Sequence, residues 1–248
     1  MHSFGLRRRR LTLLLAAAVA APASLAAQAG DWELHPLHPG SSTSDWTSLT
    51  VYVGDQSNTS LPVPVSRLRG LTSALIDGAD TTLVFSIPSA AGTVSFTGRA
   101  GHGSGSGEYR FAVNRAFSDT LEAHGVRGHT SSFDLFRLAL RDVKLADVDA
   151  LVAALRRYDG ELPDAGEYIR LMNHDVDAGV LAEFGDAGLR RLDAEQLIRL
   201  TNHDVNGTFV KWARANGHAD LDVEGLIRLK ERKGEFRPAR EARIHRSY

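Results

Sequence analysis

Two nearly identical nine-residue segments constrain this chain more than any other feature of its sequence. YIRLMNHDV begins at Tyr168, and LIRLTNHDV begins at Leu197, 29 residues later. Alignment on the Arg-Leu and Asp-Val pairs adds an earlier copy that ends at Val143 and an incomplete fourth copy that opens at Ile227. Self-similarity at such an interval is typical of stacked helical units. We therefore predict a helical repeat region over residues 129–234, a short α-solenoid of stacked two-helix repeats.

Helix start signals recur at the same place in these units. Two pairs match the capping box, in which the two side chains satisfy backbone N–H groups at the helix start. These pairs are Asp164 with Glu167 and Asp193 with Gln196. Further cap candidates, Asp177 and Asn206, precede a second apolar stretch in each unit. One unit is therefore predicted as helix, sharp break, helix and loop, and each unit needs a neighbour to cover its apolar side.

Two motif positions recur more strictly than the others. The third position is arginine in all four copies, at Arg137, Arg170, Arg199 and Arg228. The aspartate of Asp-Val is present in three copies, at Asp142, Asp175 and Asp204. A structural role is favoured, because an arginine fork pairs well with carboxylates of a neighbouring unit. The alternative is that the four arginines face outward and bind a protein or peptide, and the sequence leaves both possibilities open.

The preceding part of the chain has a different period. Apolar residues alternate with polar ones around Val51, Phe85, Phe96 and Phe111, which predicts half-buried antiparallel strands. A short helix with a glycine stop is predicted over residues 114–124. Residues 30–128 are therefore predicted to form a small antiparallel β-rich module with one short helix. Together with the repeats this gives an α+β fold class.

Three features of this β-rich module have competing interpretations. The segment GHGSGSG, residues 101–107, lacks the Gly-Lys-Ser/Thr of a phosphate-binding loop and leads into a strand, so we predict a flexible hairpin loop. Pro62 and Pro64 are predicted as turn residues. Trp32 and Trp46 could face a carbohydrate, although tryptophans of this kind more often fill the core of a sheet.

The N-terminus has the pattern of a secretory signal peptide. Four arginines, from Arg7 to Arg10, precede an apolar stretch that is too short to cross a bilayer comfortably, and small residues follow it. Residues 1–29 are predicted as the signal peptide, with cleavage before Gly30 or, alternatively, before Gln28. No later stretch approaches the ~20 apolar residues of a transmembrane helix. The chain is expected to be exported to the periplasm or the extracellular space.

Composition narrows the function classes further. Removal of residues 1–29 takes away four arginines and no acids, which changes the formal net charge from −1 to −5. Nucleic acid is therefore not an expected partner. The chain contains no cysteine, which excludes thiol catalysis and cysteine-based metal sites. The basic C-terminal tail, residues 235–248, could make a weak contact with an anionic surface.

The chain resembles uncharacterised exported bacterial proteins that carry helical repeats of the pattern Leu-x-x-Leu-x-x-His-Gly-Val. Similar repeats also follow some BlaR1-like M56 membrane peptidases. The segments AGTVSFTG, GSGSGEYRF and NRAFSDTLEAHGV resemble the module that precedes such repeats, so the resemblance covers residues 80–232. Aspartate replaces the glycine of His-Gly-Val, and the second helices lack the usual Thr-Pro start. The resemblance implies a module of the cell envelope and brings no catalytic motif.

An enzymatic alternative rests on the two His-Asp pairs. His174, Asp175, His203 and Asp204 could serve a metal-dependent hydrolase if they converged on one ion. The first and fourth copies carry Arg141 and Arg232 in the histidine position, which favours a copied structural residue over a required ligand. We therefore expect a non-enzymatic envelope protein without a cofactor that binds an envelope protein or peptide. The alternatives are the metal-dependent hydrolase and a purely structural or regulatory component.

Overall fold

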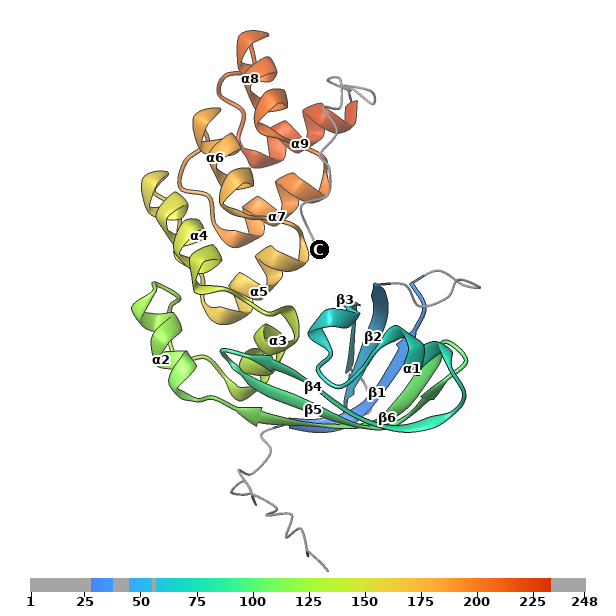
Figure 1. Ribbon diagram of the computed structural model, residues 1–248. Helices are drawn as coiled ribbons and strands as arrows, with labels where there is room; N and C mark the ends of the chain where they lie inside the picture. The colour runs from blue at the N-terminus through green and yellow to red at the C-terminus, as the bar shows by residue number, and fades with distance from the viewer. Residues whose placement is uncertain (1–27, 38–44, 55–56, 233–248) are drawn as a thin grey trace, which may run out of the picture.

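The computed structural model describes residues 28–37, 45–54 and 57–232. Over these residues the fold is mixed α+β, with a six-stranded antiparallel sheet and nine α-helices (Figure 1). The predicted α+β class is therefore confirmed. Residues 1–27 of the predicted signal peptide and the whole predicted basic tail lie outside the described residues. The first strand begins at Gln28, so cleavage before Gly30 would remove two of its residues, whereas cleavage before Gln28 leaves it whole.

The sheet has the strand order β3-β2-β1-β6-β5-β4, and every neighbouring pair is antiparallel. The strands are β1 (Gln28–His35), β2 (Trp46–Val53), β3 (Ser57–Pro64), β4 (Thr81–Ser89), β5 (Gly92–Gly101) and β6 (Ser104–Val113). The period-two alternation identifies β2, β4, β5 and β6 correctly. The prediction of Pro62 and Pro64 as turn residues is wrong, because both lie in β3. This strand is at the edge of the sheet, where a residue without an N–H group is tolerated.

Helical segments interrupt and follow the strands of the sheet. They are the 3-10 helix η1 (Val65–Arg67) and the α-helices α1 (Ser73–Asp77), α2 (Ala116–Ala123), α3 (Ser132–Arg141), α4 (Leu145–Arg157), α5 (Ala165–Asn173), α6 (Ala178–Asp186), α7 (Ala194–Asn202), α8 (Gly207–Ala215) and α9 (Val223–Arg232). The predicted short helix is confirmed as α2, and Gly125 after it has a left-handed φ of 99°. The β-rich range also contains η1 and α1, whose five residues or fewer give no clear helical period.

The glycine-rich segment is part of the sheet. Gly101 ends β5 and Ser104 begins β6, so only His102 and Gly103 form the turn. Both residues have positive φ angles, 53° and 86°. A two-residue hairpin turn with positive φ at both positions matches the right-handed twist of the flanking strands. The prediction of a hairpin is therefore correct, but the prediction of a flexible loop over residues 101–107 is wrong, because Gly105 and Gly107 pair within the strands.

Glycines in β5 and β6 make room for Trp32. Gly98 pairs with Gly107, and a Cβ atom at Gly98 would lie 2.8 Å from the Trp32 ring. The fully buried indole donates from Nε1 to the carbonyl oxygens of Thr97 and Glu108, each at 3.1 Å. The strands of the sheet therefore accommodate a buried tryptophan ring, and its indole N–H group is hydrogen-bonded. Trp32 is a core residue and does not face a carbohydrate.

Helix α3 lies against the inner face of this sheet, where the first repeat meets the aromatic core. Phe136 stacks on Tyr109 with ring centroids 5.1 Å apart and also contacts Phe111 at 5.4 Å. Arg67 of η1 donates to the carbonyl oxygen of Leu140 at 3.1 Å, near the C-terminal end of the same helix. Two contacts therefore hold α3 in place. Phe136 packs on aromatic rings of the sheet, and Arg67 of η1 binds a carbonyl group near the C-terminal end of the helix.

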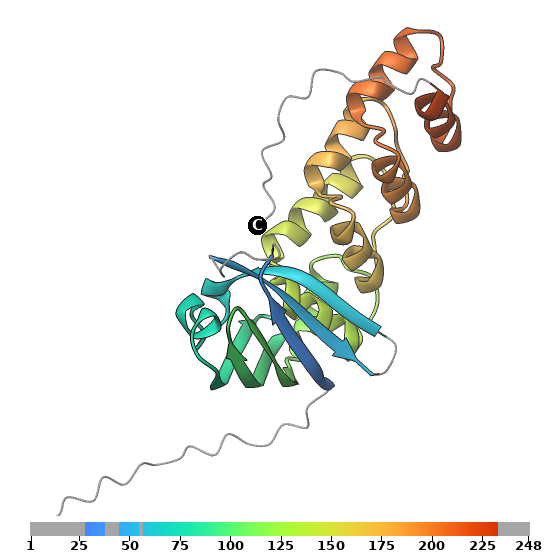
Figure 2. The ribbon, with the colours of Figure 1, turned by 90° about the vertical axis from the view of Figure 1, so that its right-hand side faces the viewer.

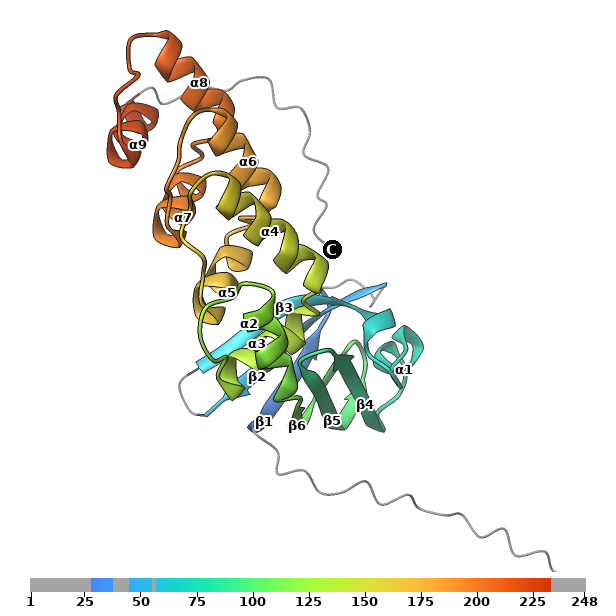
Figure 3. The same cartoon turned by 90° about the vertical axis from the view of Figure 1, so that its left-hand side faces the viewer.

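The remaining helices leave the sheet in two rows. Helices α3, α5, α7 and α9 contact one another in sequence, and α4, α6 and α8 form a second row (Figure 3). Figure 2 shows both rows rising away from the sheet in the same direction. Apolar residues of both rows are buried, for example Leu171 and Leu200 in one row and Leu181 and Val210 in the other. None of the described helices is both long and apolar enough to cross a membrane.

We expect the substitution Phe136→Ala to destabilise the whole chain by about 3–5 kcal/mol, because it removes the ring that joins α3 to the sheet and leaves a cavity there. The measurement is the free energy of unfolding in urea. Phe133→Ala on the same helix is the matched control, since Phe133 is 39% exposed, and its effect should stay below about 1 kcal/mol. Equal losses for the two variants would contradict the assigned role of Phe136.

Candidate functional site

The repeat arginines of the two central units make contacts to the following unit. Arg170 of α5 forms an ion pair with Glu195 at the start of α7. Arg199 of α7 donates to Glu224 at the start of α9, with Nη2 2.8 Å from Oε2. Both pairs are close to half exposed, so each stabilises the fold by only about 0–1 kcal/mol. The glutamates were not predicted, although each follows its arginine by 25 residues.

The arginines of the first and last units have other surroundings. Arg137 lies 3.5 Å from Asp134 on its own helix and has its guanidinium 5.7 Å from the centre of the Phe133 ring. Gly166 occupies the place in α5 that glutamate occupies in the next two units, so Arg137 has no acidic partner in the following unit. Arg228 of α9 forms no ion pair with any other described residue. The four predicted site residues therefore fall into two pairs with different environments.

The histidines also reach from one unit to the next. His174 Nδ1 lies 2.9 Å from the side-chain oxygen of Asn202, and His203 Nδ1 lies 3.0 Å from a carboxylate oxygen of Glu231. Each histidine thus contacts the residue 28 positions later, and the two imidazoles take part in separate contacts. In the described ranges no three His, Cys, Asp or Glu side chains lie together as ligands for one metal ion. The two histidines therefore make equivalent contacts at positions 29 residues apart.

The repeated aspartates end the first helix of each unit in a left-handed conformation. Their φ angles are 53° at Asp142, 56° at Asp175 and 53° at Asp204. A residue of this conformation reverses the chain after a helix, and glycine or a short polar residue adopts it most easily. Asp142 has a second role, since its carboxylate lies 2.6 Å from Lys144 Nζ and 3.8 Å from Arg67 Nε. The sharp break predicted within each unit is this left-handed residue.

Helix N-termini in the units match the predicted caps. Capping boxes are present at Asp164 with Glu167 and at Asp193 with Gln196, so both are confirmed. Asp177 and Asn206 accept hydrogen bonds from backbone N–H groups at the start of α6 and α8. These local bonds determine where each short helix begins, and the left-handed aspartate determines where the first helix of the pair ends.

Burial and hydrogen bonding shift the pKa values of several groups in the helical region. Arg141, which stands in the histidine position of the first unit, has its pKa lowered by burial and by the nearby positive charge of Arg137. Burial raises the pKa of Tyr168 in α5 to about 12. The pKa of Tyr158 is raised mainly because its hydroxyl donates to Asp186, at 2.7 Å. These tyrosines stay neutral at physiological pH and act as packing groups.

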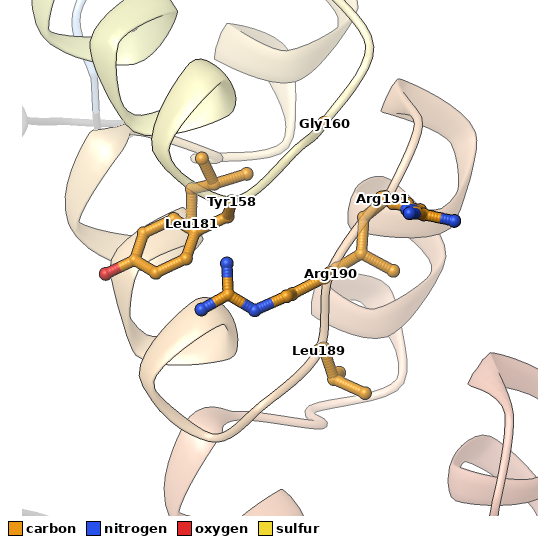
Figure 4. Close-up of a pocket in the computed structure, with 7 residues that line it drawn as sticks. Tyr158, Gly160, Leu181, Leu189, Arg190 and Arg191 are labelled. Carbon is orange, nitrogen blue, oxygen red and sulfur yellow. The ribbon is translucent and has the colours of Figure 1, made fainter.

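A small cavity lies beside Tyr158, between α6, the loop after α4 and the loop before α7. Figure 4 shows Arg190 extending toward the Tyr158 ring, and the guanidinium carbon lies 5.7 Å from the ring centre. The cavity also involves Gly160, Leu181 and Leu189 and has a volume of about 10 Å³. A cavity of this size holds about one water molecule. It is a packing defect between units and gives no room for a substrate.

Comparisons with known proteins return no relatives. The chain matches no protein-family model, and no curated protein or solved structure is significantly similar to it. The resemblance to exported repeat proteins therefore remains a prediction from the sequence.

We expect Asp204→Gly to raise the free energy of unfolding by about 0.5–1 kcal/mol. Glycine adopts the left-handed conformation without steric cost, and the change removes a negative charge from a helix C-terminus. Asp204 is exposed, so little packing is lost. The temperature of thermal unfolding should rise by about 1–4 °C in this variant, whereas Asp204→Val should lower it. A lower unfolding temperature for the glycine variant would mean that the carboxylate itself stabilises the turn.

Proposed function

We propose that this chain is a non-enzymatic, exported envelope protein in which helices α3–α9 form a short α-solenoid that binds a protein or peptide. The observation that carries the proposal is the repetition of the same contacts between successive helix pairs. Arg170 and Arg199 pair with glutamates of the next unit, and His174 and His203 reach the next unit in the same way. Copies of one contact build an extended surface, which is the form of site that repeat proteins present to partners.

The ligand surface that we propose is the row of repeat arginines along α3, α5, α7 and α9. Arg170 and Arg199 are occupied by glutamates, so they hold neighbouring units in register. Arg137, which pairs only within its own helix, and Arg228, which forms no ion pair with another described residue, are the cationic ends of this row and the arginines that we propose contact an acidic segment of a partner. The partly exposed ring of Phe133 beside Arg137 adds an apolar contact. An acidic protein segment with an apolar residue therefore fits this row.

The stacked geometry can be tested by completing the ion-pair series. We expect Gly166→Glu to raise the free energy of unfolding by about 1 kcal/mol, from better helix propensity, a favourable charge at a helix N-terminus and a new ion pair with Arg137. A Cβ atom at Gly166 meets only the Asp164 carboxylate, at 3.3 Å. Urea unfolding of the single and double variants with Arg137→Ala isolates the ion pair. A coupling energy of zero would contradict equivalent stacking of the first and second units.

Partner binding can be tested by affinity capture from an envelope extract with the exported chain as bait, followed by titration of the captured protein. We expect the double variant Arg137→Ala/Arg228→Ala to bind about tenfold or more weakly, with unchanged thermal stability. Arg156→Ala is the matched control, because Arg156 is exposed on α4 in the other row, and it should bind normally. Arg170→Ala and Arg199→Ala should lower stability by up to about 1 kcal/mol each.

Two outcomes would favour the other functions. Normal binding by the double variant, with lower stability in every arginine variant, would favour a purely structural or regulatory component. Stoichiometric metal in the purified protein that disappears in His203→Ala would favour the metal-dependent hydrolase.

A further inference from the structure

The outer face of the sheet carries a polar depression that is separate from the helical rows. Inner-face residues such as Leu34 and Phe96 are buried, while the alternating positions of the same strands face away from α3. On this outer face the strand register places Glu33 of β1 opposite Ser106 of β6, and Ser106 opposite Arg99 of β5. A carboxylate and a guanidinium therefore stand on either side of a small hydroxyl residue, two strand spacings apart.

This depression, here called the sheet trough, has a cavity volume of about 310 Å³. Its floor consists of small residues of the β5–β6 hairpin: Ala100, Gly101, Ser104, Gly105 and Ser106. Its walls consist of longer side chains, with Glu33 and His35 on one side and Asp80 and Arg99 on the other. The volume is at the lower end of the range of about 300–1,000 Å³ for small-molecule sites. Gly101 allows the chain of Asp80 to approach closely, since a Cβ atom there would lie 2.7 Å from the Asp80 Cα atom.

One wall of the trough is preorganised by hydrogen bonds. Tyr52 donates from its hydroxyl to Glu33 Oε2 at 2.9 Å, and His35 Nε2 lies 3.3 Å from the same oxygen. These hydrogen bonds lower the pKa of Glu33, so its carboxylate stays ionised and keeps acceptor capacity on its other oxygen. Across the trough Arg99 and Asp80 form no ion pair within the part of the chain that is described. Donors and acceptors therefore face each other over a floor of hydroxyl and backbone groups.

The arrangement discriminates between ligand classes. A metal ion would be repelled by Arg99, and a phosphate would be repelled by the carboxylates of Glu33 and Asp80. An apolar ligand would leave the charged walls without hydrogen bonds, which is costly. A ligand with several hydroxyl groups satisfies both walls, because each hydroxyl donates to a carboxylate and accepts from a guanidinium or imidazole.

We propose that the sheet trough is a binding site for a saccharide, held by Glu33 and Asp80 as acceptors and by Arg99 as a donor. The site is independent of the repeat arginines and of the partner proposed for them. An envelope protein with both surfaces would attach its helical rows to a glycan.

The test is a titration of the isotope-labelled exported chain, followed by the backbone amide signals in NMR spectra. The saccharide probes are chitotetraose and maltotetraose, and the other probes are diglycine and inorganic phosphate. We expect at least one saccharide to shift the amide signals of residues 33–35 and 99–106 in a saturable way. Glu33→Gln and Arg99→Gln should each weaken this binding by about tenfold. Arg110→Gln is the matched control on the same face of β6, opposite Ser95 and outside the trough, and it should bind normally.

Three results would overturn the proposal. The first is that no probe shifts these amide signals, and the second is that diglycine or phosphate shifts them while both saccharides do not. The third is an equal loss of binding in Arg99→Gln and Arg110→Gln. Thermal unfolding of each variant verifies that the chain is folded. The double variant of Arg137 and Arg228 should bind saccharide normally, so failure here and failure of the proposed partner binding are distinguishable.

Discussion

The contact between Phe136 and the aromatic core of the sheet is the interaction on which the rest of the structure depends. A pair of short helices cannot bury its apolar side alone, so a row of such pairs needs a surface on which to begin. The sheet supplies that surface with Tyr109 and Phe111, and the first unit carries phenylalanine where the next units carry isoleucine. The aromatic ring extends further than isoleucine and reaches the sheet. The sheet therefore covers one end of the helical rows.

Within the rows, apolar burial supplies most of the stability and the polar contacts supply register. Each buried leucine or isoleucine contributes about 1.5–3 kcal/mol, whereas a half-exposed Arg–Glu pair contributes about 0–1 kcal/mol. The polar contacts instead determine where the helices begin and end and how neighbouring helices are aligned. A capping aspartate determines where a helix begins, a left-handed aspartate determines where it ends, and Arg170 and Arg199 align one unit with the next. The sequence repeats these polar residues because each unit needs the same start, end and alignment.

The two proposed binding surfaces follow from what each part of the fold leaves uncovered. In the helical rows the central arginines pair with glutamates of the following unit, whereas Arg137 pairs within its own helix and Arg228 with no other described residue, so the proposed partner surface lies at the ends of the row. In the sheet, all strong packing lies on the inner face, and the outer face keeps charged side chains around a floor of glycine and serine. Glycines serve both faces at different positions, since Gly98 makes room for Trp32 on the inner side and Gly101 lines the trough.

The sequence by itself determined the local features, because they depend on residues close together in the chain. The capping boxes, the breaks at Asp175 and Asp204, the glycine stop after α2 and the strands of clean alternation are all of this kind. Only the tertiary structure decided which arginines are occupied, since Arg137 and Arg170 differ through Gly166 and Glu195 on the following units. It also decided that the prolines of β3 lie at a sheet edge and that Glu33, Ser106 and Arg99 form one line. These features depend on strand register and helix stacking, which join residues that local sequence preferences do not connect.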